Sequence, residues 1–141
     1  MTKKTLLIAL LLLSALACGG IGMAYDYDLV GEYAVWAPDR LTDAAIVQKV
    51  PESSSGTVVV KSMVVAFGWD DAFIIAKQHP KLEESNELAQ SAEVDTSVTH
   101  WFIIDVANGD VHGPLTEDEY WARRQALDVP EVLEFSQTIA P

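Results

Sequence analysis

The amino-acid sequence predicts an α+β domain in which an antiparallel meander sheet of about five or six strands carries one C-terminal helix. Three observations lead to this fold class. Short apolar segments alternate with turn-forming residues, as in sheets built from hairpins. The pair Asn108-Gly109 is typical of a tight hairpin turn, and Thr116 with Glu119 forms a capping box that marks a helix start. A small barrel closed by the same strands is the alternative.

Three strands are expected in the first half of the domain, at residues 31–36, 44–50 and 57–69. Pro38-Asp39 ends the first strand, and the composition of residues 51–56 predicts a turn between the other two. Both alternating faces of 57–69 are largely apolar. We therefore expect one central, long or bent strand there, covered on both sides.

Asp70-Asp71 predicts a turn, after which residues 72–79 return as a strand that Pro80 ends. Residues 81–96 are polar and acidic with poor apolar spacing, so we expect a surface excursion with one short helix around 82–92.

Residues 100–106 are expected to form the strand before the Asn-Gly turn. The returning strand at Val111-His112 should be short, because Gly113-Pro114 follows it.

The predicted helix covers residues 116–128 and ends before Pro130. Leu115 and Tyr120 stand at the positions of a hydrophobic staple, and acidic residues fill the first turn, where the helix dipole favours them. An apolar side for packing on the sheet is expected from four residues: Tyr120, Trp121, the stem of Arg124, and Leu127.

Three segments carry a resemblance to a known family: residues 67–78 (FGWDDAFIIAKQ), residues 101–105 (WFIID) and residues 113–116 (GPLT). In this order they resemble small bacterial secreted or lipoprotein domains of a family known only as a domain of unknown function. The resemblance covers roughly the second half of the domain. It implies no activity and no catalytic residues.

The N-terminus has the order of a secretory signal. Lys3 and Lys4 precede the apolar residues 6–13, and small residues follow, so residues 1–17 are expected to be a removed signal peptide. The apolar stretch is too short to stay in a bilayer as a spanning helix. The small residue before Cys18 resembles a bacterial lipobox, which predicts that Cys18 becomes a lipid-modified (palmitate-type acylated) N-terminus.

Two alternatives remain open for the N-terminus. Ala15 and Ala17 also fit ordinary A-x-A cleavage, and cleavage after Ala24 would leave a soluble periplasmic or secreted protein. With lipidation, residues 18–28 would be a flexible tether and 29–141 one globular domain on the cell envelope. Gly19 in place of aspartate resembles lipoproteins sent to the outer membrane of Gram-negative cells.

The exported part is strongly acidic, because 9 − 2 = 7 basic residues remain against 21 acidic ones, a formal charge of 7 − 21 = −14. Such a charge repels nucleic acid and anionic lipid heads and attracts a basic protein, although it also serves solubility. The single cysteine excludes an internal disulfide and a cysteine-based metal site. The oligomeric state is left open.

No motif predicts catalytic, cofactor-binding or metal-ligating residues. His79, His100, His112 and Asp110 lack the spacing that fixes two imidazoles on one face. The serines of 51–56 lack a nucleophile elbow. Carboxylate pairs such as Asp70-Asp71 and Glu83-Glu84 arise by chance among 21 acids.

Three tryptophans in predicted strands, Trp36, Trp69 and Trp101, either form an aromatic surface for sugar or peptide or fill the core, and we favour the core. The sequence thus favours a non-enzymatic, lipid-anchored envelope protein that binds another protein or has an accessory role. Two further hypotheses are an inhibitor or immunity-type protein against a cationic hydrolase or toxin, and an envelope hydrolase.

Overall fold

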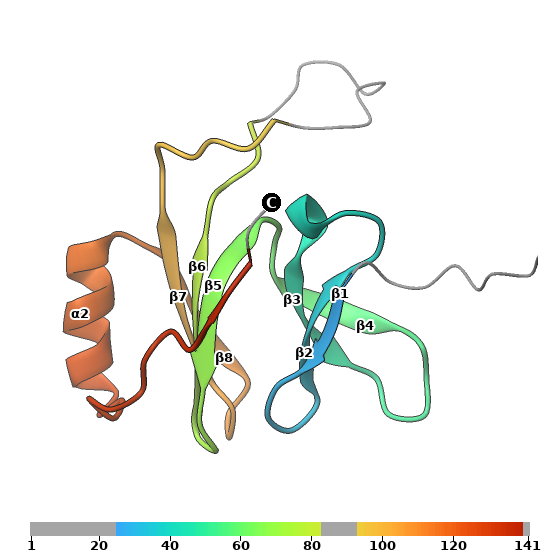
Figure 1. The fold of residues 1–141 in the computed structure, drawn as a ribbon. Coiled ribbons are helices and arrows are strands. Elements are labelled where there is room, and N and C mark those ends of the chain that lie inside the picture. The colour runs from blue at the N-terminus through green and yellow to red at the C-terminus, as the bar shows by residue number, and fades with distance from the viewer. Residues whose placement is uncertain (1–24, 83–92, 140–141) are drawn as a thin grey trace, which may run out of the picture.

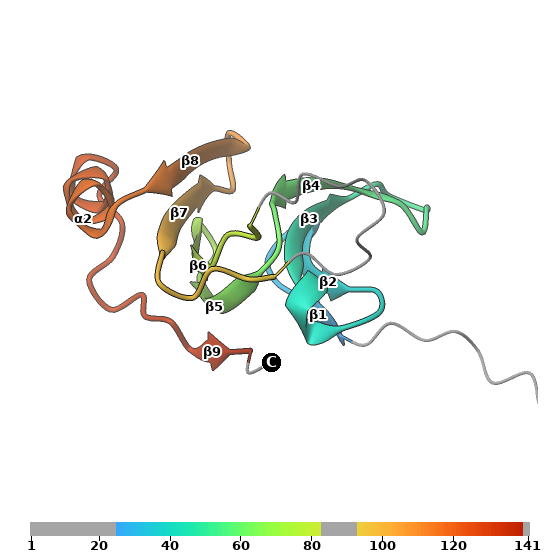
Figure 2. The ribbon, with the colours of Figure 1, turned by 90° about the horizontal axis from the view of Figure 1, so that it is seen from above.

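The computed structural model describes residues 25–82 and 93–139. These residues form three layers: helix α2, a five-stranded sheet and a four-stranded sheet (Figure 1). Both sheets are antiparallel throughout. The predicted antiparallel sheet structure with one helix near the C-terminus is confirmed, but the strands belong to two sheets instead of one meander (Figure 2).

The four-stranded sheet, sheet A, is a meander in the order β1-β2-β3-β4. Its strands are β1 (Tyr25–Asp28), β2 (Tyr33–Ala37), β3 (Ala45–Lys49) and β4 (Gly56–Val60). The strands expected at 31–36 and 44–50 are confirmed as β2 and β3. Residues 25–28 were expected in the tether, and this was wrong. Their alternation Tyr-Asp-Tyr-Asp places both tyrosines against the core and both aspartates in solvent, which is a strand pattern.

The expectation of one strand over 57–69 was also wrong. The chain leaves sheet A after Val60 and enters the second sheet at Val64, the first residue of β5. The break falls at Lys61-Ser62, whose carbonyls accept hydrogen bonds from Nε2 of the buried Gln78 at 2.9 and 3.2 Å. The Gln78 amide therefore supplies hydrogen bonds to two carbonyls that the bend removes from the ladders of both sheets.

The five-stranded sheet, sheet B, has the order β8-β7-β6-β5-β9. Its strands are β5 (Val64–Trp69), β6 (Phe73–Gln78), β7 (His100–Asp105), β8 (Asp110–Leu115) and β9 (Gln137–Thr138). The strands at 72–79 and 100–106 are confirmed, as are the Asp70-Asp71 turn before the first and the Asn108-Gly109 turn after the second. The expectation that the returning strand at 111–112 is short was wrong, since β8 continues through Gly113-Pro114. It can do so because β8 is an edge strand, where Pro114 removes no required ladder bond.

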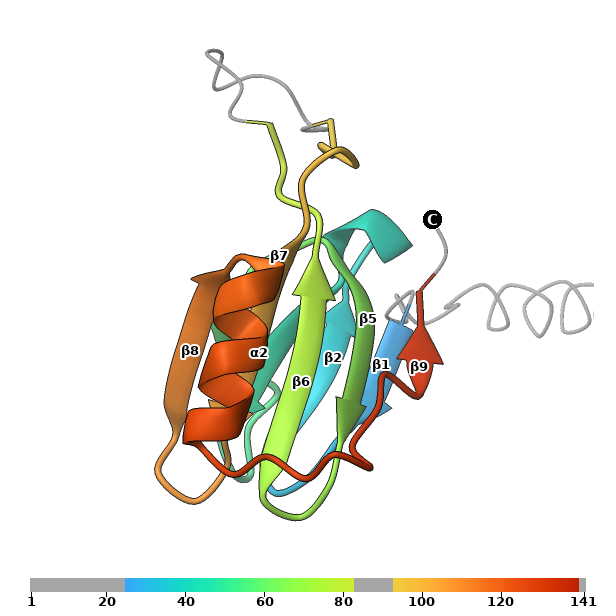
Figure 3. The same cartoon turned by 90° about the vertical axis from the view of Figure 1, so that its left-hand side faces the viewer.

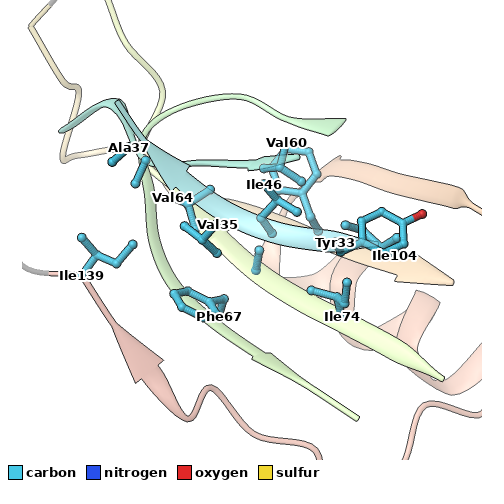
Figure 4. Close-up of a cluster of buried hydrophobic side chains, with 13 residues drawn as sticks. Tyr33, Val35, Ala37, Ile46, Val60, Val64, Phe67, Ile74, Ile104 and Ile139 are labelled. Atoms are coloured by element: carbon cyan, nitrogen blue, oxygen red, sulfur yellow. The ribbon is translucent and has the colours of Figure 1, made fainter. Parts of the chain in front are cut away.

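Strands β6 and β7 are apolar on both faces because each contributes to two cores. Ile74 and Ile104 point toward sheet A and join the core between the two sheets (Figure 4). Ile75 and Ile103 point the other way, toward α2. The two-sided burial expected for 57–69 therefore belongs to β6 and β7.

Helix α2 (Glu117–Ala126) packs on β7 and β8, and both of its ends are capped. The predicted capping box is present: Thr116 N–H donates to Glu119 Oε2 at 2.8 Å, and Glu119 N–H donates to Thr116 Oγ1 at 3.3 Å. The bonds from Thr116 hold the pKa of the Glu119 carboxyl below its usual range.

The C-terminal end of α2 is a Schellman motif. Asp128 has φ 54° and its N–H donates to Gln125 O, while Val129 N–H donates to Arg124 O. The motif reverses the chain direction, so the segment after the helix crosses in front of the lower end of β6 and reaches β5 as β9 (Figure 3). Gly68 permits this path, since a Cβ there would lie 1.9 Å from Glu134 O.

Several expectations fall on residues outside the described ranges. They are the signal at 1–17, the lipidation of Cys18, and most of the short helix at 82–92. Within residues 25–82 and 93–139, no helix is long and apolar enough to cross a membrane.

Candidate binding site

A surface concavity of about 670 Å³ lies at the C-terminal end of α2. We call it the α2 concavity; its lining residues are Trp121, Arg124, Gln125, Asp128, Val129 and Glu131. The first three share one helix face because they are spaced by three and four residues. Asp128, Val129 and Glu131 belong to the Schellman turn and the chain after it. The helix and the returning chain therefore form the walls of the concavity together.

Arg124 is the buried polar group of this site, with 6% of its surface exposed. Its Nη1 donates to Tyr120 Oη at 3.0 Å. Its Nη2 donates to the carbonyls of Pro130 at 2.6 Å and Leu133 at 2.5 Å, with Glu131 O at 3.4 Å. One guanidinium thus ties the helix to the chain that follows it.

The Arg124 charge has no carboxylate partner among the ion pairs of the described residues, which are Lys49–Asp28 and Lys81–Asp43. Backbone carbonyls and the negative end of the helix dipole stabilise it instead. The same burial raises the pKa of Tyr120, although the Arg124 charge and hydrogen bond act in the opposite direction. Arg124 therefore has a structural role, and most of its hydrogen-bonding capacity is used internally.

Trp121 is the exposed aromatic group of the concavity, with 48% of its surface exposed. Its ring packs edge-on against Tyr120, with centroids 5.2 Å apart, and the Arg124 guanidinium carbon lies 5.4 Å from its centroid. These contacts fix the orientation of an indole that remains open to solvent. The exposed carboxylates of Asp128 and Glu131 and the amide of Gln125 complete the accessible groups.

The sequence placed Tyr120, Trp121, Arg124 and Leu127 on the packing side of the helix. Tyr120 and Arg124 are buried and Leu127 is half-buried, as expected. Trp121 is not, because it follows Tyr120 by one position and so points about 100° away around the helix.

The three strand tryptophans do not share a surface. Trp101 is buried between β7 and α2, and Trp69 packs against Tyr27 and Phe67 at the core between the sheets. Trp36 points away from that core, and its ring edge lies against Gly56. The expectation that tryptophans fill the core is confirmed for Trp101 and Trp69.

Two of the three histidines, His79 and His100, have separate hydrogen-bond partners, and His112 lies in β8. His79 Nδ1 lies 2.8 Å from Val98 O, and His100 Nδ1 lies 3.1 Å from Gln78 Oε1. In the part of the chain that the structure describes, no group of three His, Cys, Asp or Glu residues is placed to hold a metal ion. Asp70 accepts the N–H groups of Ala72 and Phe73, which is the turn role expected of it.

Residues 30–139 match the model of a family described as a protein of unknown function, DUF3997. The chain belongs to the DUF3997 family. This confirms the resemblance to an uncharacterised family, and the match extends over sheet A except β1, all of sheet B, α2 and the α2 concavity. No curated protein and no solved structure matches this DUF3997 chain.

Replacing Arg124 with lysine tests the structural role of its guanidinium. Lysine keeps the charge but cannot span Tyr120 Oη and the carbonyls together, so we expect the free energy of unfolding to fall by about 2–3 kcal/mol in urea. The same change at the neighbouring, exposed Arg123 should alter it by less than about 0.5 kcal/mol. Equal effects at the two positions would contradict this role.

Proposed function

We propose that this DUF3997 protein is an exported, lipid-anchored protein of the cell envelope that acts without catalysis, by binding a basic partner protein. The observation that carries the proposal is the α2 concavity, where an oriented, half-exposed indole stands beside two exposed carboxylates. Exposed tryptophans that are held in place are typical anchors of protein interfaces. The exposed charged groups that line the concavity with Trp121 are acidic.

The charge of the whole chain supports a basic partner. The formal net charge is −12, and the described ion pairs engage only two of the carboxylates, those of Asp28 and Asp43. A protein with such an excess of acidic groups attracts cationic partners from a distance and repels nucleic acid. The long-range field brings a basic protein to the surface, and the α2 concavity supplies a specific contact.

Binding of a basic peptide tests this function. The full chain, purified in detergent, should bind hexalysine at about 20 mM salt and lose at least about tenfold in affinity at 500 mM salt, because salt screens exposed charges. Fluorescence anisotropy of labelled peptide measures both affinities, with hexaglutamate as the control. Absence of hexalysine binding at the lower salt concentration would contradict the proposal.

The location of the protein is proposed from the N-terminal sequence. A basic start, an apolar segment and Cys18 after a small residue support cleavage before Cys18 and acylation of its thiol. Several acyl chains together suffice for stable anchoring.

Intact mass of the protein extracted from membranes tests the anchor. We expect a chain that begins at Cys18 and carries acyl mass, while the Cys18→Ser variant should lack that mass. An unmodified chain that begins at Tyr25 would show that the protein is exported without a lipid.

A further inference from the structure

We infer that the α2 concavity takes an arginine side chain of the partner, stacked on Trp121 and paired with the carboxylates of Asp128 and Glu131. This inference rests on the proposed function, because it names the chemical group that the basic partner presents. It follows from which groups of the concavity are already used within the protein and which remain available.

The positively charged group of the concavity, the Arg124 guanidinium, already binds other groups of the same domain. Arg124 is buried, and its two terminal nitrogens donate to Tyr120 Oη and to backbone carbonyls of residues 130–133. These oxygens offset the guanidinium charge at close range. An incoming cation therefore meets the Arg124 charge already offset by these oxygens. The exposed carboxylates of Asp128 and Glu131 remain to attract it.

The remaining groups match a guanidinium ion. The concavity offers the exposed part of an indole ring, the Gln125 amide, and two exposed carboxylates three residues apart in sequence. Arginine stacks on an aromatic ring through its planar face while its edge donates to carboxylates. Arg124 already places a guanidinium 5.4 Å from the same ring, so this indole packs against that ion within the protein itself.

Arginine is favoured over lysine by the combination of ring and carboxylates. A lysine ammonium is a compact, strongly hydrated charge that gains from the carboxylates but stacks less well on an indole. Long-range attraction to the acidic chain is the same for both residues. The difference between peptides of arginine and lysine with equal length and charge therefore isolates the local contact from the overall charge.

The experiment compares hexaarginine with hexalysine, each binding to the full chain in detergent at about 100 mM salt. We expect the wild-type chain to prefer hexaarginine by about two- to fivefold, the gain typical of an exposed cation–aromatic contact. Trp121→Ala should remove the preference and Trp121→Phe should retain part of it. Urea unfolding of each variant verifies that the domain is folded.

The carboxylates need a charge-matched control. Asp128→Asn with Glu131→Gln should weaken hexaarginine binding by more than Asp39→Asn with Glu52→Gln, which removes two exposed charges at sheet A instead. Asparagine suits position 128 because it tolerates the positive φ found there.

The outcomes separate this inference from the proposed function. Loss of the arginine preference in Trp121→Ala, with hexalysine binding unchanged, supports the site. If the preference for hexaarginine persists in Trp121→Ala, the arginine site is wrong, while the proposal of a basic partner is unaffected. If the wild-type chain binds neither peptide, the proposed function itself fails. Trp121-dependent binding of neutral chitohexaose without an arginine preference would instead assign the concavity to sugars.

Discussion

The guanidinium of Arg124 links α2 to the part of the chain that closes the fold. A buried cation is unfavourable unless its hydrogen bonds are satisfied, and here Tyr120 Oη and carbonyls of residues 130–133 satisfy them. These carbonyls belong to a segment without helix or strand. The chain after the Schellman turn is therefore held against the helix by the requirement to solvate one charge.

Both cores depend on the path that Arg124 fixes. The segment that binds Arg124 supplies Leu133 to the core under α2. Further along, the chain adds β9 to the edge of β5 and supplies Ile139 to the core between the sheets. The close approach of Glu134 to Gly68 lies between these contacts. The α2 concavity is a product of the same path, because its walls are α2 and the returning chain. The α2 concavity and the stability of the domain thus depend on the same set of interactions.

Local signals in the sequence predicted the elements that local interactions determine. Thr116 with Glu119 placed the helix start, Asn108-Gly109 placed a turn, and apolar segments placed β6 and β7. The division into two sheets was not predictable in this way. An apolar alternation continues across Lys61-Ser62, and only the contact with Gln78, distant in sequence, shows where the chain changes sheet. The path of β8 through Pro114 likewise depends on its place at the sheet edge.

The candidate site was predicted only in its parts. Helical spacing identified Trp121 and Arg124 as neighbours on α2 but assigned both to packing. Asp128 was taken as the helix end, without a role for its carboxylate. Glu131 is brought beside them by the chain reversal at positive φ and by the hydrogen bonds from Arg124 to carbonyls of residues 130–133. Neither follows from residue spacing, because both depend on where the chain goes after the helix.

Amide hydrogen exchange in the Arg124→Gln variant tests the central claim most directly. The N–H groups of Val129, Leu133 and Ile139 donate to Arg124 O, Pro130 O and Val65 O in the folded chain. If Arg124 fixes the C-terminal path, exchange should accelerate at all three, including Ile139 far along the chain, while β6 and β7 stay protected. Acceleration confined to Val129, with Ile139 as protected as in the wild type, would contradict the account.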